Sequence, residues 1–129
     1  MENRERGLHY KLHRNILVIY ITNDLDHHMV EQWRECSERL IAAGGVKHII
    51  FDFSDVEFMD SSGIGLIMGR YKKVMFLGGK VAVTNVGRVV NRIFSLSGVY
   101  KIIDRYDSVD EALLEINKKT QKGVVEKCN

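Results

Sequence analysis

Hydrophobic residues fall into two kinds of segment, short dense runs and longer stretches in which they recur three and four positions apart. The dense runs contain many β-branched and aromatic residues and predict strands at residues 8–12, 16–22, 46–53, 80–84 and 101–104. The longer stretches predict helices between residues 26 and 44, between 60 and 78, over 87–97 and after 108. The two kinds of segment alternate along most of the chain.

Residues between these segments indicate where the predicted strands and helices begin and end. Arg14 and Asn15 suit a hairpin turn between the first two strands, and the glycine pairs at 44–45 and 78–79 end the first two helices. Polar side chains at 23–26 and at Ser108 can cap helix N-termini. From Lys118 onwards the chain is polar, and we expect this tail, residues 118–129, to fray.

The predicted order is strand-strand-helix-strand-helix-strand-helix-strand-helix, which indicates an α/β fold. Helices between successive strands act as crossover connections, so most of the sheet should be parallel. We therefore predict a mixed, mostly parallel sheet of about five strands with about four helices. The 129 residues match one domain, with a core over about 8–117.

Composition narrows the class of protein. Hydrophobic residues make up 45% and charged residues 28% of the chain, a balance that favours a globular fold over disorder. The formal charge of +2, with both signs well mixed, argues against direct nucleic-acid binding. Cys36 and Cys128 are too few and too far apart for a disulfide framework. With neither a signal peptide nor a membrane-spanning run, we expect a cytoplasmic protein without a membrane partner.

Residue patterns for catalysis or cofactor binding are incomplete. His27 and His28 are adjacent and would diverge on a helix, so they do not predict a metal site. A serine hydrolase would need a histidine after its nucleophile, and no histidine follows His48. The glycines at 63 and 65 lack the rest of a nucleotide-binding loop, and with Gly69 they indicate close packing or close approach of a partner. We predict no enzyme activity, no metal and no cofactor.

The segment Asp60-Ser61-Ser62 at the start of the second helix allows two interpretations. The simpler one is an N-cap, in which Asp60 or Ser61 accepts a hydrogen bond from the first helical turn. The alternative is a phosphorylation site, because free N–H groups and a partial positive charge at a helix N-terminus tolerate a phosphate. Such a modification would change the exposed surface and leave the core intact.

A long contiguous motif decides between these interpretations. The stretch FMDSSGIGLIMGRYK at 58–72 closely resembles the anti-sigma factor antagonists of the STAS domain family, especially those of the sporulation sigma-F pathway. The similarity continues at DLDHH (24–28), at KHII (47–50) and over 90–104, so that it covers roughly residues 8–117. The predicted order of elements also agrees with the STAS fold, in which helices lie mainly on one side of a mixed sheet.

The resemblance implies a regulatory protein without catalysis of its own. In this family the unphosphorylated antagonist binds an ATP-dependent anti-sigma factor, which releases its sigma factor. The anti-sigma factor is also a serine kinase that phosphorylates the antagonist, and a serine phosphatase resets the cycle. The resemblance makes Ser61 the phosphate acceptor and assigns partner binding to Asp26, Asp60, Ser62, Gly63, Ile64 and Gly65.

Three other readings of the residues stay open. The chain could be a STAS scaffold or ligand-sensing domain of another regulatory system, such as a stressosome, with the same fold and a different partner. A nucleotide-binding protein would use the glycine-flanked helix start. A receiver-like phosphoaspartate switch would use Asp52 at a strand end, although the further acidic residues and the lysine of such a site are missing.

Overall fold

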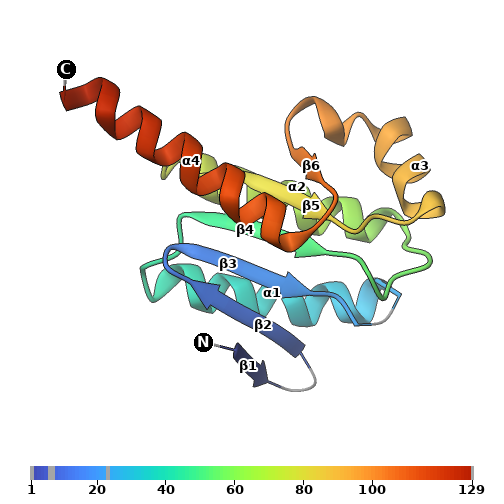
Figure 1. Cartoon of the computed structure of the whole chain (residues 1–129). Helices are drawn as coiled ribbons and strands as arrows, with labels where there is room; N and C mark the ends of the chain where they lie inside the picture. The colour runs from blue at the N-terminus through green and yellow to red at the C-terminus, as the bar shows by residue number, and fades with distance from the viewer. Residues whose placement is uncertain (1, 6–7, 23, 129) are drawn as a thin grey trace.

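The computed structural model describes residues 2–5, 8–22 and 24–128, and the side chains of 8–22 and 24–118 (Figure 1). Six strands form the sheet: β1 (Glu2–Glu5), β2 (Leu8–His13), β3 (Ile16–Tyr20), β4 (His48–Asp52), β5 (Val81–Thr84) and β6 (Asp104–Tyr106). The α-helices are α1 (His27–Ala42), α2 (Ser61–Met75), α3 (Arg88–Ser97) and α4 (Val109–Cys128), and a short 3₁₀ helix, η1 (Val99–Lys101), follows α3.

The strands lie side by side in the order of the chain. The pairs β1–β2 and β2–β3 are antiparallel, whereas β3–β4, β4–β5 and β5–β6 are parallel. The predicted mixed, mostly parallel α/β fold with four helices is therefore confirmed. The sheet has one strand more than predicted, because β1 comes from a charged segment without the apolar pattern of a strand.

The central strands are buried on both faces. On one face, Leu17, Ile19 and their neighbours pack with Trp33 of α1 and Leu66 of α2. On the other face, a smaller cluster joins Ile16, Val18, Ile50 and Ala82 to α4 through Ala112 and Ile116. This two-sided burial explains why Ile49, Ile50 and Phe51 of β4 form an apolar run without alternation. Figure 1 shows helices on both faces of the sheet.

Most predicted boundaries agree with the structure. Arg14 adopts a positive φ of 59° in the β2–β3 hairpin, and Gly44 and Gly78 have φ values of 86° and 76° just after α1 and α2. The N–H of Glu111 donates to Ser108 Oγ at 3.1 Å, which confirms the cap of α4. Cys36 is buried and unbridged, whereas the Cys128 side chain lies outside the described side chains.

One boundary differs from the prediction. The last strand is Asp104–Tyr106 and not 101–104, because Gly98 adopts a left-handed conformation that leads into η1 before the sheet resumes. Ile103, predicted within the strand, instead packs into the core ahead of it. The helix α4 runs over Val109–Cys128 and so includes the polar segment from Lys118, whose fraying stays a prediction.

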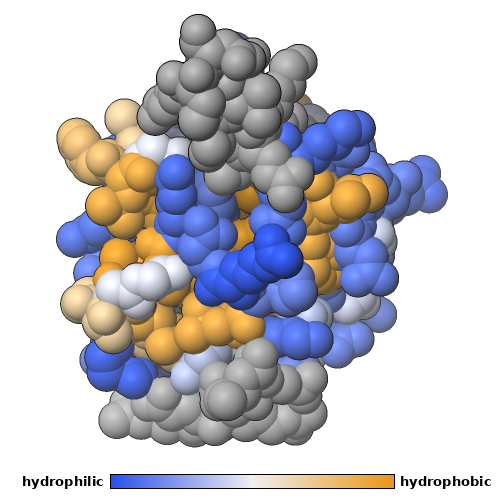
Figure 2. Space-filling view, turned by 60° about the vertical axis from the view of Figure 1, so that its left-hand side comes forward, coloured by the Kyte–Doolittle hydropathy of each residue, from blue (hydrophilic) through white to orange (hydrophobic). Residues whose placement is uncertain are grey.

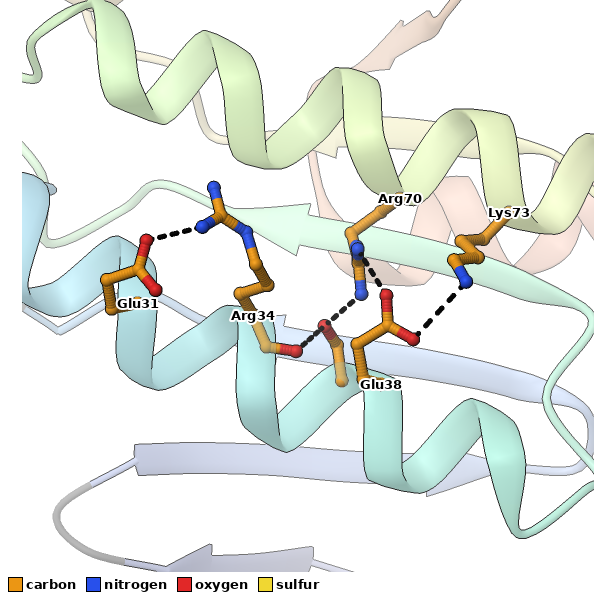
Figure 3. Close-up of polar contacts among 6 residues, drawn as sticks. Glu31, Arg34, Glu38, Arg70 and Lys73 are labelled. Carbon is orange, nitrogen blue, oxygen red and sulfur yellow. Dashed lines mark hydrogen bonds and ion pairs between the residues drawn. The ribbon is translucent and has the colours of Figure 1, made fainter.

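A buried arginine ties α1 to α2 (Figure 3). Arg70 of α2 is 4% exposed, and its guanidinium donates to Ser37 Oγ at 3.0 Å and pairs with Glu38 at 2.7 Å. Lys73 reaches the same carboxylate at 3.5 Å. Burial raises the pKa of Glu38, but the hydrogen bond and charge of Arg70 outweigh it, so the pKa is lowered. The two helices thus pack with a defined register.

Candidate partner-binding site at two helix N-termini

The N-termini of α1 and α2 lie next to each other at the carboxyl end of the parallel strands. The chain leaving β3 enters α1, and the chain leaving β4 enters α2. Leu25 and Met59, which lie in these two connections, form an isolated parallel β-bridge and are both buried. Because each is followed by an aspartate that caps its helix, Asp26 and Asp60 occupy corresponding positions.

Both aspartates cap their helices with a side-chain oxygen. Asp26 accepts from the N–H of Met29 at 2.9 Å, and Asp60 accepts from the N–H of Ser62 at 2.9 Å. The hydrogen bonds from Ser62 are the main reason why the pKa of Asp60 is lowered, and the charge of His27 acts in the same direction. The predicted caps are confirmed, and Asp60, not Ser61, is the capping residue of α2.

Asp24 joins the two connections from the side. One carboxylate oxygen of this residue accepts the N–H groups of Glu57 and Phe58, each at 3.1 Å. These bonds span more than thirty residues and fix the segment that precedes Asp60 and Ser61. The sequence offered no signal for this role, since a single aspartate in a loop does not reveal which distant N–H groups it accepts.

The two serines of the motif have different environments. The Ser62 hydroxyl donates to Asp60 Oδ1, so it is part of the cap. Ser61 is exposed, and its hydroxyl makes no hydrogen bond within the described part of the chain. It occupies the first position of α2, where the helix N–H groups point outwards. Of the two hydroxyls, Ser61 is therefore the one available to a reagent from solution.

The three other predicted docking residues lie at different depths. Gly63 is buried, and a Cβ there would come within 2.9 Å of Met59 Sδ and 3.1 Å of Leu25 Cδ2. Gly65 is exposed and faces open space, with no atom within 4 Å of a Cβ built on it. Ile64 is partly buried. Gly63 thus supports the β-bridge from inside, while Gly65 belongs to the outer surface.

An apolar groove begins at Ser61 and runs between α2 and α3. Phe58 is 53% exposed at one side of it and Leu96 is 79% exposed at the other. The groove is also lined by Met59, Asp60, Ser61, Ile64, Ile93 and Ser97. The docking patch read from the sequence did not include the α3 residues, because the helical pattern of α3 shows its buried face and not what its exposed face adjoins.

Asp52, which a receiver-like switch would use as its phosphate acceptor, has a structural role in this fold. The carboxylate of Asp52 is buried and accepts hydrogen bonds from Ser54 Oγ at 2.6 Å, Thr84 Oγ1 at 2.8 Å and Asn85 Nδ2 at 2.6 Å. It holds the ends of β4 and β5 together. Among the described residues, no three His, Cys, Asp or Glu side chains are grouped so as to hold a metal ion.

The comparisons with known proteins agree with one another. A model of the STAS domain matches residues 8–112. An anti-sigma F factor antagonist of Paenibacillus polymyxa is 38% identical over 104 residues, 81% of this chain and 89% of the relative.

Two solved structures are similar as well. The anti-sigma factor antagonist SpoIIAA in its unphosphorylated form has a TM-score of 0.79 and 31% identity, covering 86% of this chain and 96% of the other. The Bacillus cell fate determinant SpoIIAA in the phosphorylated form has a TM-score of 0.68 and 31% identity, covering 84% and 96%. In the described part of the chain, no helix combines the length and apolarity that crossing a bilayer requires.

Proposed function

Because the chain belongs to the STAS domain family, we propose that it is an anti-sigma factor antagonist controlled by phosphorylation of Ser61. In its unmodified form it binds an anti-sigma factor with serine kinase activity and thereby frees a sigma-F-type sigma factor. The same kinase uses ATP to phosphorylate Ser61, and a serine phosphatase removes the phosphate. The protein acts in the cytoplasm, and its own role is binding, without catalysis.

The observation that carries the proposal is the unequal state of the two serines. Ser61 presents a free, exposed hydroxyl at the start of α2, whereas Ser62 is engaged with Asp60. A phosphate on Ser61 would leave that cap intact. The comparisons support the same view, since a relative is named an anti-sigma F factor antagonist and a similar structure is titled as phosphorylated.

The surface around Ser61 suits a protein partner. Phe58 and Leu96 provide exposed apolar area on the two sides of the groove, while Asp26 and Asp60 provide negative charge beside it. Gly65 lies one helical turn after Ser61 and allows a partner's backbone to approach closely. Apolar area ringed by polar groups is the usual anatomy of a protein–protein interface.

Phosphorylation at this position would act as a switch by electrostatics and desolvation. It would add about −1.5 to −2 charges at neutral pH beside the carboxylates of Asp60 and Asp26. A partner would then have to desolvate or pair this charge at the centre of the contact. We expect binding to weaken by about 5- to 150-fold, the range typical of coupled binding equilibria.

Intact-mass spectrometry after incubation with the cognate anti-sigma factor and ATP tests the acceptor residue. We expect one added phosphate on the wild type and on Ser62→Ala, and none on Ser61→Ala. Ser61→Ala should still bind the anti-sigma factor, whereas Ser61→Asp should fold and bind poorly. Circular dichroism of each variant provides the control for folding.

Other outcomes would change the assignment. A phosphate on Ser61→Ala but not on Ser62→Ala would move the acceptor to Ser62. Unimpaired anti-sigma factor binding by the fully phosphorylated protein would show that phosphorylation of Ser61 does not control binding. No phosphate on any variant, with a kinase shown to be active on another antagonist, would favour a STAS scaffold or ligand-sensing role.

A further inference from the structure

The end of α2 opposite Ser61 carries three exposed hydrophobic residues in a row. Met75 is 47%, Phe76 85% and Leu77 52% exposed, and we refer to these three residues as the α2 tip. Met75 ends α2, and Phe76 and Leu77 follow it, at the amino end of the parallel strands, which lies on the left in Figure 1. A single exposed hydrophobic residue is ordinary, but three large ones adjacent in the chain form an apolar patch of the kind that marks interaction sites.

The α2 tip is held outwards by an ordered turn. The N–H groups of Leu77 and Gly79 donate to the carbonyl oxygen of Val74 at 2.9 and 2.8 Å, and that of Gly78 donates to Met75 at 3.0 Å. Behind the turn, a Cβ at Gly79 would lie 1.7 Å from the carbonyl oxygen of Lys47. Because the backbone is fixed on this side against Lys47, just before β4, the apolar side chains project into solvent.

Lysines surround the α2 tip. Lys72 lies one helical turn before Phe76, and Lys47 lines a hollow together with Leu77. Lys80 follows the turn directly, and none of these three ammonium groups has an ion-pair partner among the described side chains. Lys73 is the exception, because it reaches Glu38 at 3.5 Å.

The buried His48 lies behind two of these lysines, Lys47 and Lys80. Its pKa is lowered to about 4, first by burial and then by the charges of Lys47 and Lys80. Because Lys47, Lys72 and Lys80 have no ion-pair partner among the described side chains, the surface around the α2 tip is positive as well as apolar. Figure 2 brings this end of the molecule forward and shows hydrophobic surface interspersed with hydrophilic side chains.

We propose that the α2 tip docks onto an anionic membrane surface, with Met75, Phe76 and Leu77 entering the interface and the surrounding lysines meeting lipid phosphates. Charge complementarity favours this partner, since anionic lipid attracts lysines near the surface. The exposure of Phe76 favours it too, because this side chain is 85% exposed on a turn that leaves the helix. A protein partner fits less well, since lysine is depleted in protein–protein interfaces.

This surface and the site around Ser61 can be used together. The 15 residues of α2 separate them by roughly 22 Å along the helix axis. A chain resting on lipid through its α2 tip would keep the Ser61 end free for a protein partner. The inference goes beyond the proposed function and does not depend on it. It departs from the expectation of no membrane partner, which rested on the lack of a membrane-spanning run and did not consider binding at the lipid surface.

Cosedimentation with lipid vesicles tests the inference. The probes are vesicles of phosphatidylcholine alone and vesicles containing about one third phosphatidylglycerol. We expect the full chain to bind the anionic vesicles only, and to bind them less at high salt. Phe76→Ser should weaken binding about tenfold. Lys72→Gln combined with Lys80→Gln should weaken it about 10- to 30-fold.

Leu96→Ser is the matched control, because Leu96 is 79% exposed but lies in the groove beside Ser61. It should bind vesicles like the wild type. Equal binding to both kinds of vesicle, no binding to either, or an equal loss in Leu96→Ser and Phe76→Ser would overturn the inference. Self-association that depends on Phe76, without vesicle binding, would overturn it in favour of a second copy of the chain. Phe76→Ser should still be phosphorylated on Ser61 by the anti-sigma factor and ATP. A failure of the membrane inference can therefore be distinguished from a failure of the proposed function.

Discussion

Leu25 and Met59 pair as a parallel β-bridge one residue before the two aspartates that cap α1 and α2. The bridge brings two crossover connections of the sheet into register beyond the ends of their strands. It therefore places Asp26 beside the start of α2 and Asp60 beside the start of α1. The candidate site depends on this pairing as much as on the motif that contains Ser61.

The first prediction concerns Asp24, which holds the segment before Ser61 through the N–H groups of Glu57 and Phe58. Asp24→Ala should lower the free energy of unfolding by about 1 kcal/mol, because both bonds are exposed and water replaces them in part. It should also weaken anti-sigma factor binding, since the segment loses its fixed position. Urea unfolding and titration with the anti-sigma factor measure the two effects.

Asp55→Ala is the control for Asp24→Ala, because Asp55 is an exposed carboxylate in the same connection with no hydrogen bond to the described residues. Asp24→Asn should recover most of the loss, as its amide oxygen can still accept. If Asp24→Ala binds the anti-sigma factor like Asp55→Ala, Asp24 does not position the site.

Local patterns predicted much of this molecule from the sequence. The Arg14 turn, the Ser108 cap and the apolar stripes of the helices all arise from residues close together in the chain. The same holds for Asp60, which bonds to an N–H two residues away. The motif around Ser61 is contiguous, so it could be recognised without a structure.

Features that depend on distant residues could not be predicted. The contacts of Asp24 with Phe58 and of Arg70 with Ser37 join segments more than thirty residues apart. The strand β1 has no apolar alternation and forms by adding backbone hydrogen bonds to β2. Whether a glycine is packed, like Gly63, or open, like Gly65, depends on the opposite surface and not on its own helix.

The second prediction concerns the pair of Arg70 and Glu38. Removing the carboxylate with Glu38→Ala leaves the buried guanidinium with Ser37 as its remaining side-chain partner, and should cost about 1–3 kcal/mol of stability. Because the pKa of Glu38 is lowered in the fold, its contribution is present near neutral pH and is lost as the pH falls through that lowered value. Urea unfolding at neutral and acidic pH measures both effects.

Two further variants isolate the cause of that loss. Lys73→Ala removes the exposed partner of the same carboxylate and should cost about 0.5 kcal/mol or less. Adding Arg70→Met to Glu38→Ala should cost less than the sum of the two single changes, because no unpaired buried charge remains. Strict additivity would show that the pair contributes no coupling between α1 and α2.

The third prediction is a pH dependence of stability that originates in His48. Its Nδ1 accepts the N–H of Lys80 at 3.0 Å, and burial with the nearby Lys47 and Lys80 charges lowers its pKa from 6.5 to about 4. The unfolded chain therefore binds a proton more readily than the folded chain between these two values. Acidification from pH 6.5 to about 4 should lower the free energy of unfolding by about 3 kcal/mol through this residue.

His48→Asn removes the titrating ring and offers an amide oxygen to the N–H of Lys80. It should flatten the dependence of stability on pH in this window, measured by urea unfolding at intervals of pH. The exposed His13 provides the control variant His13→Asn. An unchanged slope in His48→Asn would assign the acid sensitivity to other groups.

The last prediction separates folding from binding at two glycines of α2. Neither Gly65 nor Gly69 has an atom within 4 Å of a Cβ built on it, so alanine fits at both positions. Each substitution should raise the stability by about 0.5–1 kcal/mol, because alanine restricts the unfolded chain and favours helix. Stability of the fold therefore does not explain why glycine stands at either position.

Binding should distinguish the two variants. Gly65 lies one turn from Ser61, whereas Gly69 lies a further turn away, so only a methyl group at 65 would meet a partner docked over Ser61. Gly65→Ala should therefore be more stable yet bind the anti-sigma factor more weakly, while Gly69→Ala should be more stable and bind like the wild type. Thermal unfolding and anti-sigma factor titration on the same samples decide the matter. Equal affinities would remove Gly65 from the docking surface, and a loss in both variants would extend that surface along α2.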